Sequence, residues 1–454
     1  MLKIFLHRLN LLSIVIIIAA LNSFSFPQKK IVGYYPNWVY IPLRQIEFGN
    51  LTHIIQAFAS VNSNGSISVP SGIPNSVLIQ SAHSVNKKVL ICVGGAGNTS
   101  GFSTIVTDSA LTANFINNIT NFITQNKYDG VDIDWEFPTI RQGAQLVTLI
   151  KNLRQKFNSI DSSLIISMAI PASPSTGQGF QYSAMINYID WYAIMNYDFY
   201  GSWSSVAGFN APLYQSIADP LNAGAGASSV QYMISKNIPK DKLLFGIPFY
   251  GKEFNAAGLY LPQKGETDLL YSDVADSLSN NNWIYYWDNT SEVPYLINNS
   301  STGFITYDDT ASIRIKTQYA VDQGLGGVMI WALGQDMLPD GKQPLLETIG
   351  SVINGTTGML AADNNIPNDF SLSNNYPNPF NPSTIIEFTI PHDGFVSLKV
   401  FNTLGEAVAT LKESELTAGL HKVSFNGSGF SSGIYFYVLS YNGLNITKKM
   451  MLLK

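Results

Sequence analysis

Short apolar runs recur between residues 30 and 333 of this chain, separated by stretches long enough for helices. Eight of them are rich in Val, Ile, Leu and Phe: residues 30–35, 52–59, 88–95, 130–135, 164–170, 191–197, 243–250 and 326–333. Near-continuous apolar strands that alternate with helical connections are typical of a parallel sheet. Eight such strands predict closure into a (β/α)₈ barrel, the TIM-barrel fold. An open doubly wound sheet is the alternative, but no G-x-G-x-x-G sequence follows the first strand to favour it.

Two segments depart from this alternation. Residues 252–310 are longer than one helix requires, and we expect a small α+β insertion over one wall of the barrel mouth or, alternatively, a long decorated loop. Residues 354–365 have the small, polar composition of a linker. Beyond them, residues 366–454 alternate short strands with turn residues, which predicts an all-β sandwich. The barrel domain is therefore expected over residues 26–353.

The first 25 residues have the features of an export signal. Lys3 and Arg8 precede the apolar run LLSIVIIIAAL, and Ser23 and Ser25 offer a small-x-small cleavage point. The apolar run is shorter than the roughly 20 residues that a membrane span requires. We therefore expect a signal peptide and no membrane span in the mature protein.

Composition narrows the possible partners. Charged residues make up 13% of the chain and the formal net charge is −5, so the basic footprint of a nucleic-acid-binding protein is absent. Cys92 is the only cysteine, so no intramolecular disulfide can form in the oxidising space that an exported protein enters. No metal, nucleotide or redox cofactor is expected. Aromatic residues reach 12%, and most of them are expected to fill a core, although exposed ones suit the flat faces of sugars.

One apolar run carries an unusual number of acids. Four carboxylates stand in DGVDIDWEFP, which starts at residue 129: Asp129, Asp132, Asp134 and Glu136. Side chains alternate along a strand, so Asp132, Asp134 and Glu136 share one face, roughly 6.6 Å apart, and the apolar residues between them share the other. Like charges this close in a barrel interior cannot all stay ionised, so one carboxyl is expected to be protonated near neutral pH.

Three alternative roles for the acids fit the sequence less well. A calcium loop also spaces acids two apart, but it requires polar residues between them and a central glycine. A structural row of ion pairs needs cations, and the segment has none. A solvated charge run would not alternate with Trp and Ile. Because functional residues gather at the C-terminal ends of barrel strands, Glu136 at the exit of the strand is the expected reactive group.

The spacing D-x-x-D-x-D-x-E also resembles the signature of glycoside hydrolase family 18, the chitinases and their relatives. The resemblance covers roughly residues 30 to 350. Further motifs are similar to the first, sixth, seventh and eighth strands of that family: GYYPNW from Gly33, MNYDFYGSW from Met195, GIPFYG from Gly246 and GGVMIWAL from Gly326.

The resemblance implies a catalytic mechanism. Glu136 would protonate the leaving glycosidic oxygen and later activate water. The family is an exception to the scheme with two catalytic carboxylates, because the 2-acetamido oxygen of the substrate attacks the anomeric carbon and the configuration is retained. Asp134 would hold the acetamido N–H and exchange a proton with Asp132. Tyr197, the fourth expected catalytic residue, would orient the acetamido group.

The resemblance also implies a substrate-binding surface. Asp198 would help Tyr197 to orient the acetamido group, and Trp331 would form the floor under the reacting sugar. The other expected substrate-binding residues are Met195, Tyr35, Trp38, Phe58, Trp203, Tyr250 and Gly95. The tryptophans and tyrosines among them would stack on consecutive sugars of a long chain.

Two positions depart from the family pattern. The third-strand motif S-x-G-G has Cys92 in place of the serine. A thiol is a weak donor, so any hydrogen bond to the buried acids would be poorer and the pH optimum could shift. Lys252 follows GIPFYG where the family often has Arg, which removes bidentate geometry.

These features favour a secreted chitinase that cleaves β-1,4-linked N-acetylglucosamine polymers. An endo-β-N-acetylglucosaminidase acting on glycoproteins and a chitin-binding lectin remain alternatives. Lectins on this barrel typically lose the glutamate, whereas Glu136 is present. The row of stacking aromatics favours a long chitin chain over a glycoprotein glycan.

The C-terminal sequence resembles a type IX secretion (Por system) sorting domain. The resemblance covers about residues 366–454, through NYPNPFNPSTIIEF, NTLGEAVATL, GLHKVSF, SSGIYFYVL and KKMMLLK. A chitin-binding sandwich is the alternative, but the crowded Pro and Asn of NNYPNPFNP are unsuited to an aromatic sugar platform. The resemblance implies the type IX machinery as a partner and a secreted or cell-surface location.

Overall fold

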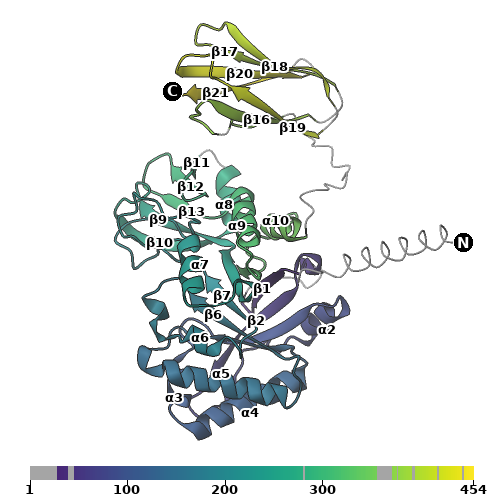
Figure 1. The fold of residues 1–454 in the computed structure, drawn as a ribbon, viewed down its shortest axis with the longest axis vertical. Coiled ribbons are helices and arrows are strands. Elements are labelled where there is room, and N and C mark those ends of the chain that lie inside the picture. Colours follow the sequence, from purple (N-terminus) through teal and green to yellow (C-terminus); the bar gives the residue numbers. More distant parts are fainter. Residues whose placement is uncertain are drawn as a thin grey trace, which may run out of the picture. The chain divides into compact units, whose positions relative to one another are not determined.

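The computed structural model describes most of the chain (Figure 1). The described residues are 28–38, 45–279, 282–354, 371–375, 377–390, 394–416, 419–441 and 444–453. They belong to two compact units that divide between residues 356 and 357. The predicted signal peptide at 1–25 and all but the first residue of the predicted linker at 354–365 lie outside the described residues. Among the described helices, none combines the length and apolar character needed to cross a bilayer.

The first unit is a closed barrel of eight parallel strands. The strands are β1 (Lys30–Pro36), β2 (His53–Val61), β4 (Lys88–Gly94), β5 (Gly130–Asp134), β6 (Ile165–Pro171), β7 (Trp191–Met195), β8 (Leu243–Pro248) and β14 (Gly327–Trp331). Each pairs in parallel with the next, and β14 pairs with β1, which closes the ring. The predicted TIM barrel is confirmed, and the open doubly wound sheet is excluded.

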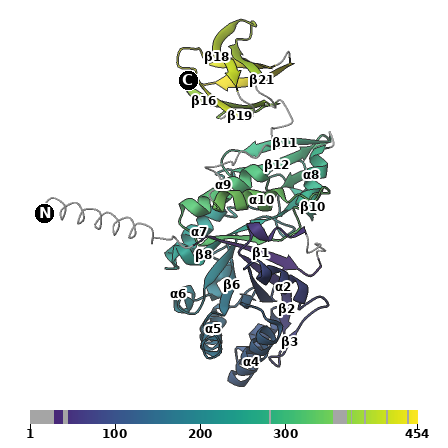
Figure 2. The same cartoon turned by 90° about the vertical axis from the view of Figure 1, so that its right-hand side faces the viewer.

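Helices cover the outside of the barrel, as Figure 2 shows for the α4 to α6 side. They are α2 (Ser76–Ser84), α3 (Ser100–Ile105), α4 (Ser109–Asn126), α5 (Gly143–Asn158), α6 (Tyr182–Met185), α7 (Gly226–Ser235), α9 (Thr310–Asp322) and α10 (Pro344–Ile353). Asp108 begins α4 by accepting hydrogen bonds from the amides of residues 110 and 111, and Asp309 begins α9 in the same way. The helix α6 has only four residues, so it covers much less of the barrel than its neighbours α5 and α7.

Alternating side chains divide the apolar residues into two layers. Val32, Ile55, Leu90 and Met329 belong to a cluster inside the barrel. A larger cluster lies between the sheet and the helices, and it contains Val131, Ile133 and Trp135 from the acidic run. Asp132 and Asp134 alternate with these residues and are buried. The predicted two-faced strand is therefore present.

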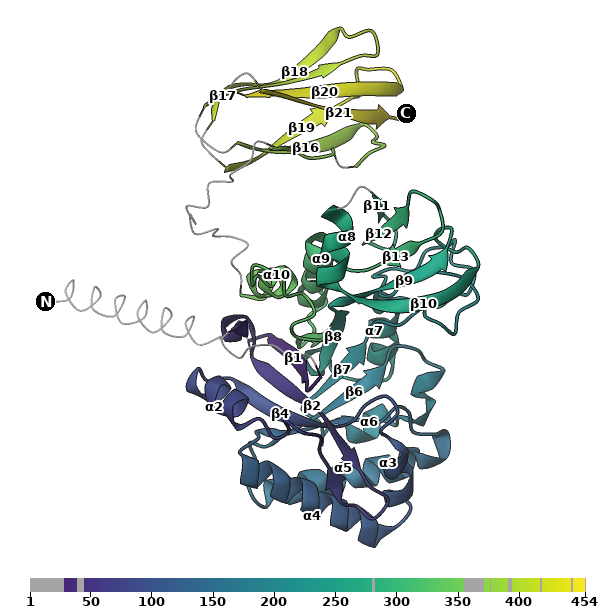
Figure 3. The same ribbon diagram turned by 180° about the vertical axis from the view of Figure 1, so that it is seen from behind.

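An α+β insertion follows β8 (Figure 3). Its antiparallel strands are β9 (Tyr250–Ala256), β10 (Gln263–Leu270), β11 (Trp283–Asp288), β12 (Val293–Asn298) and β13 (Phe304–Thr306). They are ordered β10-β9-β13-β12-β11, and the helix α8 (Tyr271–Ser279) packs through Val274 against Leu296 and Ile305 of this sheet. The expected small domain is correct, and the long loop is excluded.

The second unit is a sandwich of two antiparallel sheets. One contains β15 (Ser371–Leu372), β16 (Ser383–Ile390) and β19 (Gly419–Asn426). The other contains β17 (Gly394–Phe401), β18 (Ala407–Leu416), β20 (Gly433–Tyr441) and β21 (Leu444–Leu452). Phe388, Leu398 and Tyr437 are fully buried in a core separate from that of the barrel. The predicted all-β sandwich is confirmed.

Candidate active site at the barrel mouth

A cavity of about 330 Å³ opens where the parallel strands end. It is lined by Tyr34, Trp38, Phe58, Ala96, Asn98, Asp134, Glu136, Ala169, Met195, Tyr197, Asp198 and Trp331. These residues come from the ends of β1, β2, β4, β5, β6, β7 and β14 or from the loops directly after them. The C-terminal face of the barrel therefore brings together eight of the residues that the sequence predicted for the site.

Asp132 lies deepest in the acidic row and is held by three donors. Tyr34 Oη donates to its Oδ2 over 2.7 Å, and Ser167 Oγ donates to its Oδ1 over 2.6 Å. The Cys92 thiol also donates to Oδ2, at 3.1 Å. Burial raises the pKa of Asp132, and the three donors act in the opposite direction. Because two hydroxyls share the task, the orientation of Asp132 does not depend on the weak thiol donor alone.

Asp134 has the opposite environment. It is 4% exposed, and its Oδ1 has no hydrogen-bond partner among the described residues. Burial first, then the charges of Glu136 and Asp132, raise the pKa of Asp134 well above its ordinary value. The row needs to bind a proton to relieve its charge, and Asp134 is the carboxyl with the strongest tendency to hold it.

Glu136 stands at the open end of the row, two residues beyond the last residue of β5. It is partly exposed to the cavity, unlike the two aspartates. Burial and the charge of Asp198 raise the pKa of Glu136. A carboxyl with a raised pKa and access to the cavity can donate a proton to a bound molecule and take one back.

Aromatic rings form one wall of the cavity. Trp331 stacks on Phe58 with ring centroids 5.6 Å apart, and Phe58 stacks on Trp38 at 5.9 Å. Tyr34 is tilted against Trp331 at 5.4 Å. Trp38 is 61% exposed, so this wall continues from the cavity out to the solvent. The wall offers flat apolar surfaces for more than one ring of a bound chain.

Tyr197 follows β7 and faces the acids. Its side chain is partly buried, and its hydroxyl lies 3.9 Å from the sulfur of Met329. Burial and the charge of Asp134 are the first two causes that raise the pKa of Tyr197 well above its ordinary value. The phenol therefore keeps its proton and can donate a hydrogen bond into the cavity.

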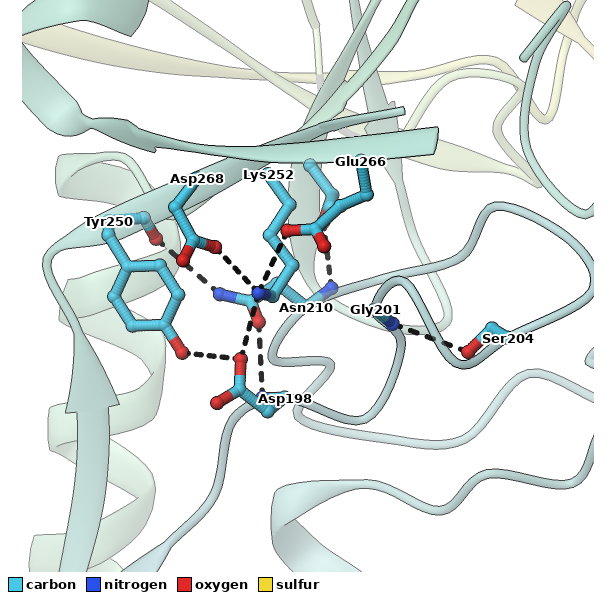
Figure 4. Close-up of polar contacts among 9 residues, drawn as sticks. Asp198, Gly201, Ser204, Asn210, Tyr250, Lys252, Glu266 and Asp268 are labelled. Carbon is cyan, nitrogen blue, oxygen red and sulfur yellow. Dashed lines mark hydrogen bonds and ion pairs between the residues drawn. The ribbon is translucent and has the colours of Figure 1, made fainter. Parts of the chain in front are cut away.

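Asp198 is fixed from behind by the insertion (Figure 4). Its Oδ1 accepts a hydrogen bond from Tyr250 Oη over 2.7 Å and lies 3.1 Å from Lys252 Nζ. The same ammonium contacts Glu266 at 3.1 Å and Asp268 at 2.7 Å. Burial lowers the pKa of Lys252, but the three carboxylates outweigh it and raise that pKa. A lysine here makes three single contacts with separate carboxylates, as expected from the absence of a guanidinium.

The backbone at Asp198 is also held in place. Its φ of 58° lies in the left-handed region, which Asp tolerates better than most residues. The Asn210 side-chain oxygen accepts a hydrogen bond from the Asp198 amide over 3.1 Å, and the Asn210 amide itself donates to Thr306 of the insertion. Asn210 therefore connects the backbone of Asp198 to the insertion.

Besides Asp132, which lies below the cavity in the acidic row, four predicted residues are not part of the cavity wall. Tyr35 is a correction, because it points into the layer between sheet and helices while its neighbour Tyr34 takes the inward position. Trp203 is 65% exposed, with Lys252 Nζ 5.9 Å from its ring. Tyr250 contacts the site by donating a hydrogen bond to Asp198. Gly95 lies behind Phe58, where a Cβ would come within 2.7 Å of the ring.

Several residues of the site were not predicted from the sequence. Ser167 is the only polar side chain in the strand LIISMAI, and that was a usable signal of a role inside the barrel. Tyr34, Ala96, Asn98 and Ala169 gave no comparable signal. Among the described residues, no group of three or more His, Cys, Asp and Glu side chains is arranged to hold a metal ion.

Comparisons with known proteins agree with this geometry. Residues 30–336 match the family model of glycosyl hydrolases family 18, and residues 374–453 match that of the secretion system C-terminal sorting domain. Chitinase A1 of Niallia circulans is 27% identical over 74% of this chain and 61% of its own length. Probable chitinase 2 of Drosophila melanogaster is 32% identical over 55% of this chain and 56% of its own length.

A solved structure shares the fold of the first unit. The Group IV chitinase of Ostrinia furnacalis, crystallised with allosamidin, superposes with a TM-score of 0.67 at 26% identity, over 72% of this chain and 99% of that one. The chain spans about 60% of the length of the two curated relatives. Both relatives and the solved structure have chitinase in their names.

Proposed function

This chain belongs to glycosyl hydrolases family 18, and we propose that it is a chitinase that cleaves β-1,4 linkages between N-acetylglucosamine units with retention of configuration. The observation that carries the proposal is the acidic row. Asp132 is held by three donors, Asp134 has a strongly raised pKa, and Glu136 opens onto a cavity with an aromatic wall.

Glu136 acts first as the acid and then as the base. Its raised pKa increases the fraction of the carboxyl that is protonated at a given pH, and the protonated form is the one that protonates the leaving oxygen. After the sugar departs, the ionised Glu136 takes a proton from the water that attacks the anomeric carbon. No enzyme nucleophile is needed, because the acetamido oxygen of the substrate attacks from within the same sugar.

Asp134 supports the internal attack. Its buried Oδ1, which has no partner among the described residues, is free to accept the acetamido N–H of the substrate. This contact makes the acetamido oxygen a better nucleophile. Transfer of a proton from Asp134 toward Asp132 would leave a negative charge beside the positive oxazolinium ring. The three donors on Asp132 control how readily that transfer occurs.

The remaining residues hold the sugar. The Tyr197 hydroxyl and Asp198 line the cavity opposite the aromatic wall and orient the acetamido group. Trp331 lies under the reacting sugar, and the exposed Trp38 continues the stacking surface for the next unit. A wall that extends into the solvent favours a polymer over the compact glycan that an endo-β-N-acetylglucosaminidase requires. The presence of Glu136 argues against a lectin.

The second unit supports export to the cell surface or the medium. It matches the family model of a secretion system sorting domain, and we propose that the type IX machinery recognises it after a signal peptide at residues 1–25 has directed the chain across the inner membrane. A chain that ends at residue 354 should then accumulate in the periplasm of a host with that machinery. Release of this truncated chain to the medium would contradict the sorting role.

Product analysis tests the proposed chemistry. The purified protein is incubated with N-acetylglucosamine oligomers of graded length, and the anomer formed first is read by proton NMR. Retention predicts the β-anomer as the initial product. Oligomers deacetylated at the reacting sugar should be inert, because they lack the internal nucleophile. An initial α-anomer, or comparable cleavage of the deacetylated oligomer, would overturn the mechanism.

A further inference from the structure

A second cavity lies on the flank of the barrel, beside α6. The single turn of α6 lies between the longer helices α5 and α7 (Figures 1 and 2). The volume of the cavity is about 530 Å³, which is within the range of roughly 300–1,000 Å³ typical of ligand sites. We call it the flank cavity. Its rim carries Ile140, Gln178, Gln181, Ser183, Tyr232 and Lys236.

Two stacked aromatic rings form the inner wall of the flank cavity. The rings of Phe180 and Tyr182 stack at 5.4 Å with 6° between their planes, and both residues are buried. Tyr182 is 2% exposed, and its hydroxyl has no hydrogen-bond partner among the described residues. A Cβ on Gly177 would lie 2.9 Å from this oxygen, so Gly177 packs directly on the hydroxyl and covers it. Polar contacts with a ligand therefore come from the rim of the cavity and not from this oxygen.

The rim has the chemistry of a site for a neutral, hydroxyl-rich ligand. No Asp or Glu lines the cavity, which disfavours a cation, and Lys236 is its single charged group. The Lys236 ammonium already makes a cation–π contact, because its Nζ lies 4.9 Å from the centroid of the Tyr232 ring. The amides of Gln178 and Gln181 can both donate and accept hydrogen bonds. Ile140, which is 66% exposed, adds an apolar surface.

The flank cavity is a neighbour of the catalytic cavity. Its rim residue Ile140 follows Glu136 by four positions. Gly179 packs directly on the carbonyl of Pro138, since a Cβ there would come within 1.8 Å of that oxygen. The segment 136–140 therefore runs from a residue of the catalytic cavity to a residue of the flank cavity. A polymer held in the first cavity presents its other units to the second at high local concentration.

We propose that the flank cavity binds N-acetylglucosamine units of the polymer outside the catalytic cavity. A pyranose ring places its apolar face on Tyr232 and Ile140, and its hydroxyl and acetamido groups reach Gln178 and Gln181. The choice of this sugar rests on the proposed function, whereas the cavity and its chemistry do not. The site holds the protein on its substrate and takes no part in bond cleavage.

Hydrogen exchange locates the binding directly. Full-length Glu136→Gln protein is mixed with the hexamer of N-acetylglucosamine, and amide exchange is followed by mass spectrometry. Peptides covering residues 176–184 and 229–236 should exchange more slowly with the hexamer, in addition to peptides from the catalytic cavity. Protection confined to the catalytic cavity would overturn the proposal.

A cavity-filling variant supplies the second test. Ala184 is exposed and lines the flank cavity, so Ala184→Trp in the Glu136→Gln background should abolish the added protection and lower the bound fraction on insoluble chitin several-fold. Ala110→Trp, at an exposed position on α4, is the matched control and should change neither. Equal binding by the two variants would refute the site. Oligomer hydrolysis by the unaltered chain is measured in parallel, so a failure of the proposed function is seen separately.

Discussion

The two ends of the acidic run around β5 carry the same kind of side chain in opposite environments. Asp129, just before the strand, lies 2.7 Å from Lys88 Nζ and 2.8 Å from His83 Nε2, and it accepts the Val89 amide over 2.8 Å. Burial alone would raise the pKa of Asp129, but these partners outweigh it and lower that pKa. Asp134, at the far end, has an oxygen without a partner and a strongly raised pKa.

The comparison shows that the partners of an acid, and not its position in a motif, decide what it does. Asp129 is compensated by the Lys88 ammonium of β4 and by contacts with His83 of α2 and the Val89 amide. Its charge therefore holds the start of β5, which we call the foot of the strand. Asp132, Asp134 and Glu136 meet no cation within hydrogen-bond reach among the described residues, so the exit of the strand retains protons. The foot stabilises the fold, and the exit is available for chemistry.

The largest expected effect is on kcat, and it distinguishes Glu136 at the exit of β5 from Asp129 at the foot. Glu136→Gln should lower kcat on a chitin oligomer by at least about 10²–10⁴-fold, because a positioned acid and base is lost. Its thermal unfolding should stay close to that of the unaltered protein, since Glu136 is partly exposed. Steady-state kinetics and calorimetry check both statements. Substantial retained turnover would remove Glu136 from the role of acid.

The reverse pattern is expected at the foot. Asp129→Ala should lower the free energy of unfolding by about 1–3 kcal/mol, because the partly buried Val89 amide loses its acceptor and Lys88 its counter-charge. The kcat of the folded variant should remain within a few-fold of normal. Denaturant unfolding measures the loss, with Asp161→Ala at a fully exposed position as the control. Unchanged stability would mean that the foot is not a structural site.

The pH dependence of stability should have opposite signs at the two ends. Asp134 has a raised pKa in the folded state, so its ionisation weakens the fold as the pH rises above the unfolded value. Asp134→Asn should therefore gain melting temperature relative to the unaltered protein, and the gain should grow as the pH rises above about 4, the ordinary pKa of an aspartate. Asp129 has a lowered pKa, so its contribution is lost as the pH falls through that value. Calorimetric scans across pH that show parallel curves would contradict this contrast.

The smallest effect on stability is expected at His83, which contacts the Asp129 carboxylate. The side chain of His83 is 35% exposed, and that of Lys88 is 54% exposed. His83→Ala should change the free energy of unfolding by less than about 1 kcal/mol, because Lys88 and the Val89 amide still contact the Asp129 carboxylate. The same denaturant experiment as for Asp129→Ala measures it. A loss equal to that of Asp129→Ala would show that the histidine, and not Lys88 with the Val89 amide, holds the foot.

The sequence predicted the barrel and its acidic row because both depend on local alternation. Apolar runs identified the strands, and the two-residue period placed Asp132 and Asp134 inside. It could not choose between Tyr34 and Tyr35, since adjacent aromatics on a strand buried on both faces give no sign of which points inward. The sequence did not reveal the role of Asp129 either, because its partners Lys88 and His83 lie about 40 residues away along the chain. Contacts between segments that are distant in the sequence could not be predicted from periodicity.

Labelling of the single cysteine can measure how often the barrel opens. Cys92 is 0% exposed inside the ring of strands, and the chain has no other thiol. A maleimide reagent can therefore reach its target only while the barrel is open, and the labelling rate counts those openings without interference from the C-terminal sandwich. Mass spectrometry of labelled protein would time the opening of the barrel interior in cell extracts, on surfaces or during export, with no engineered probe.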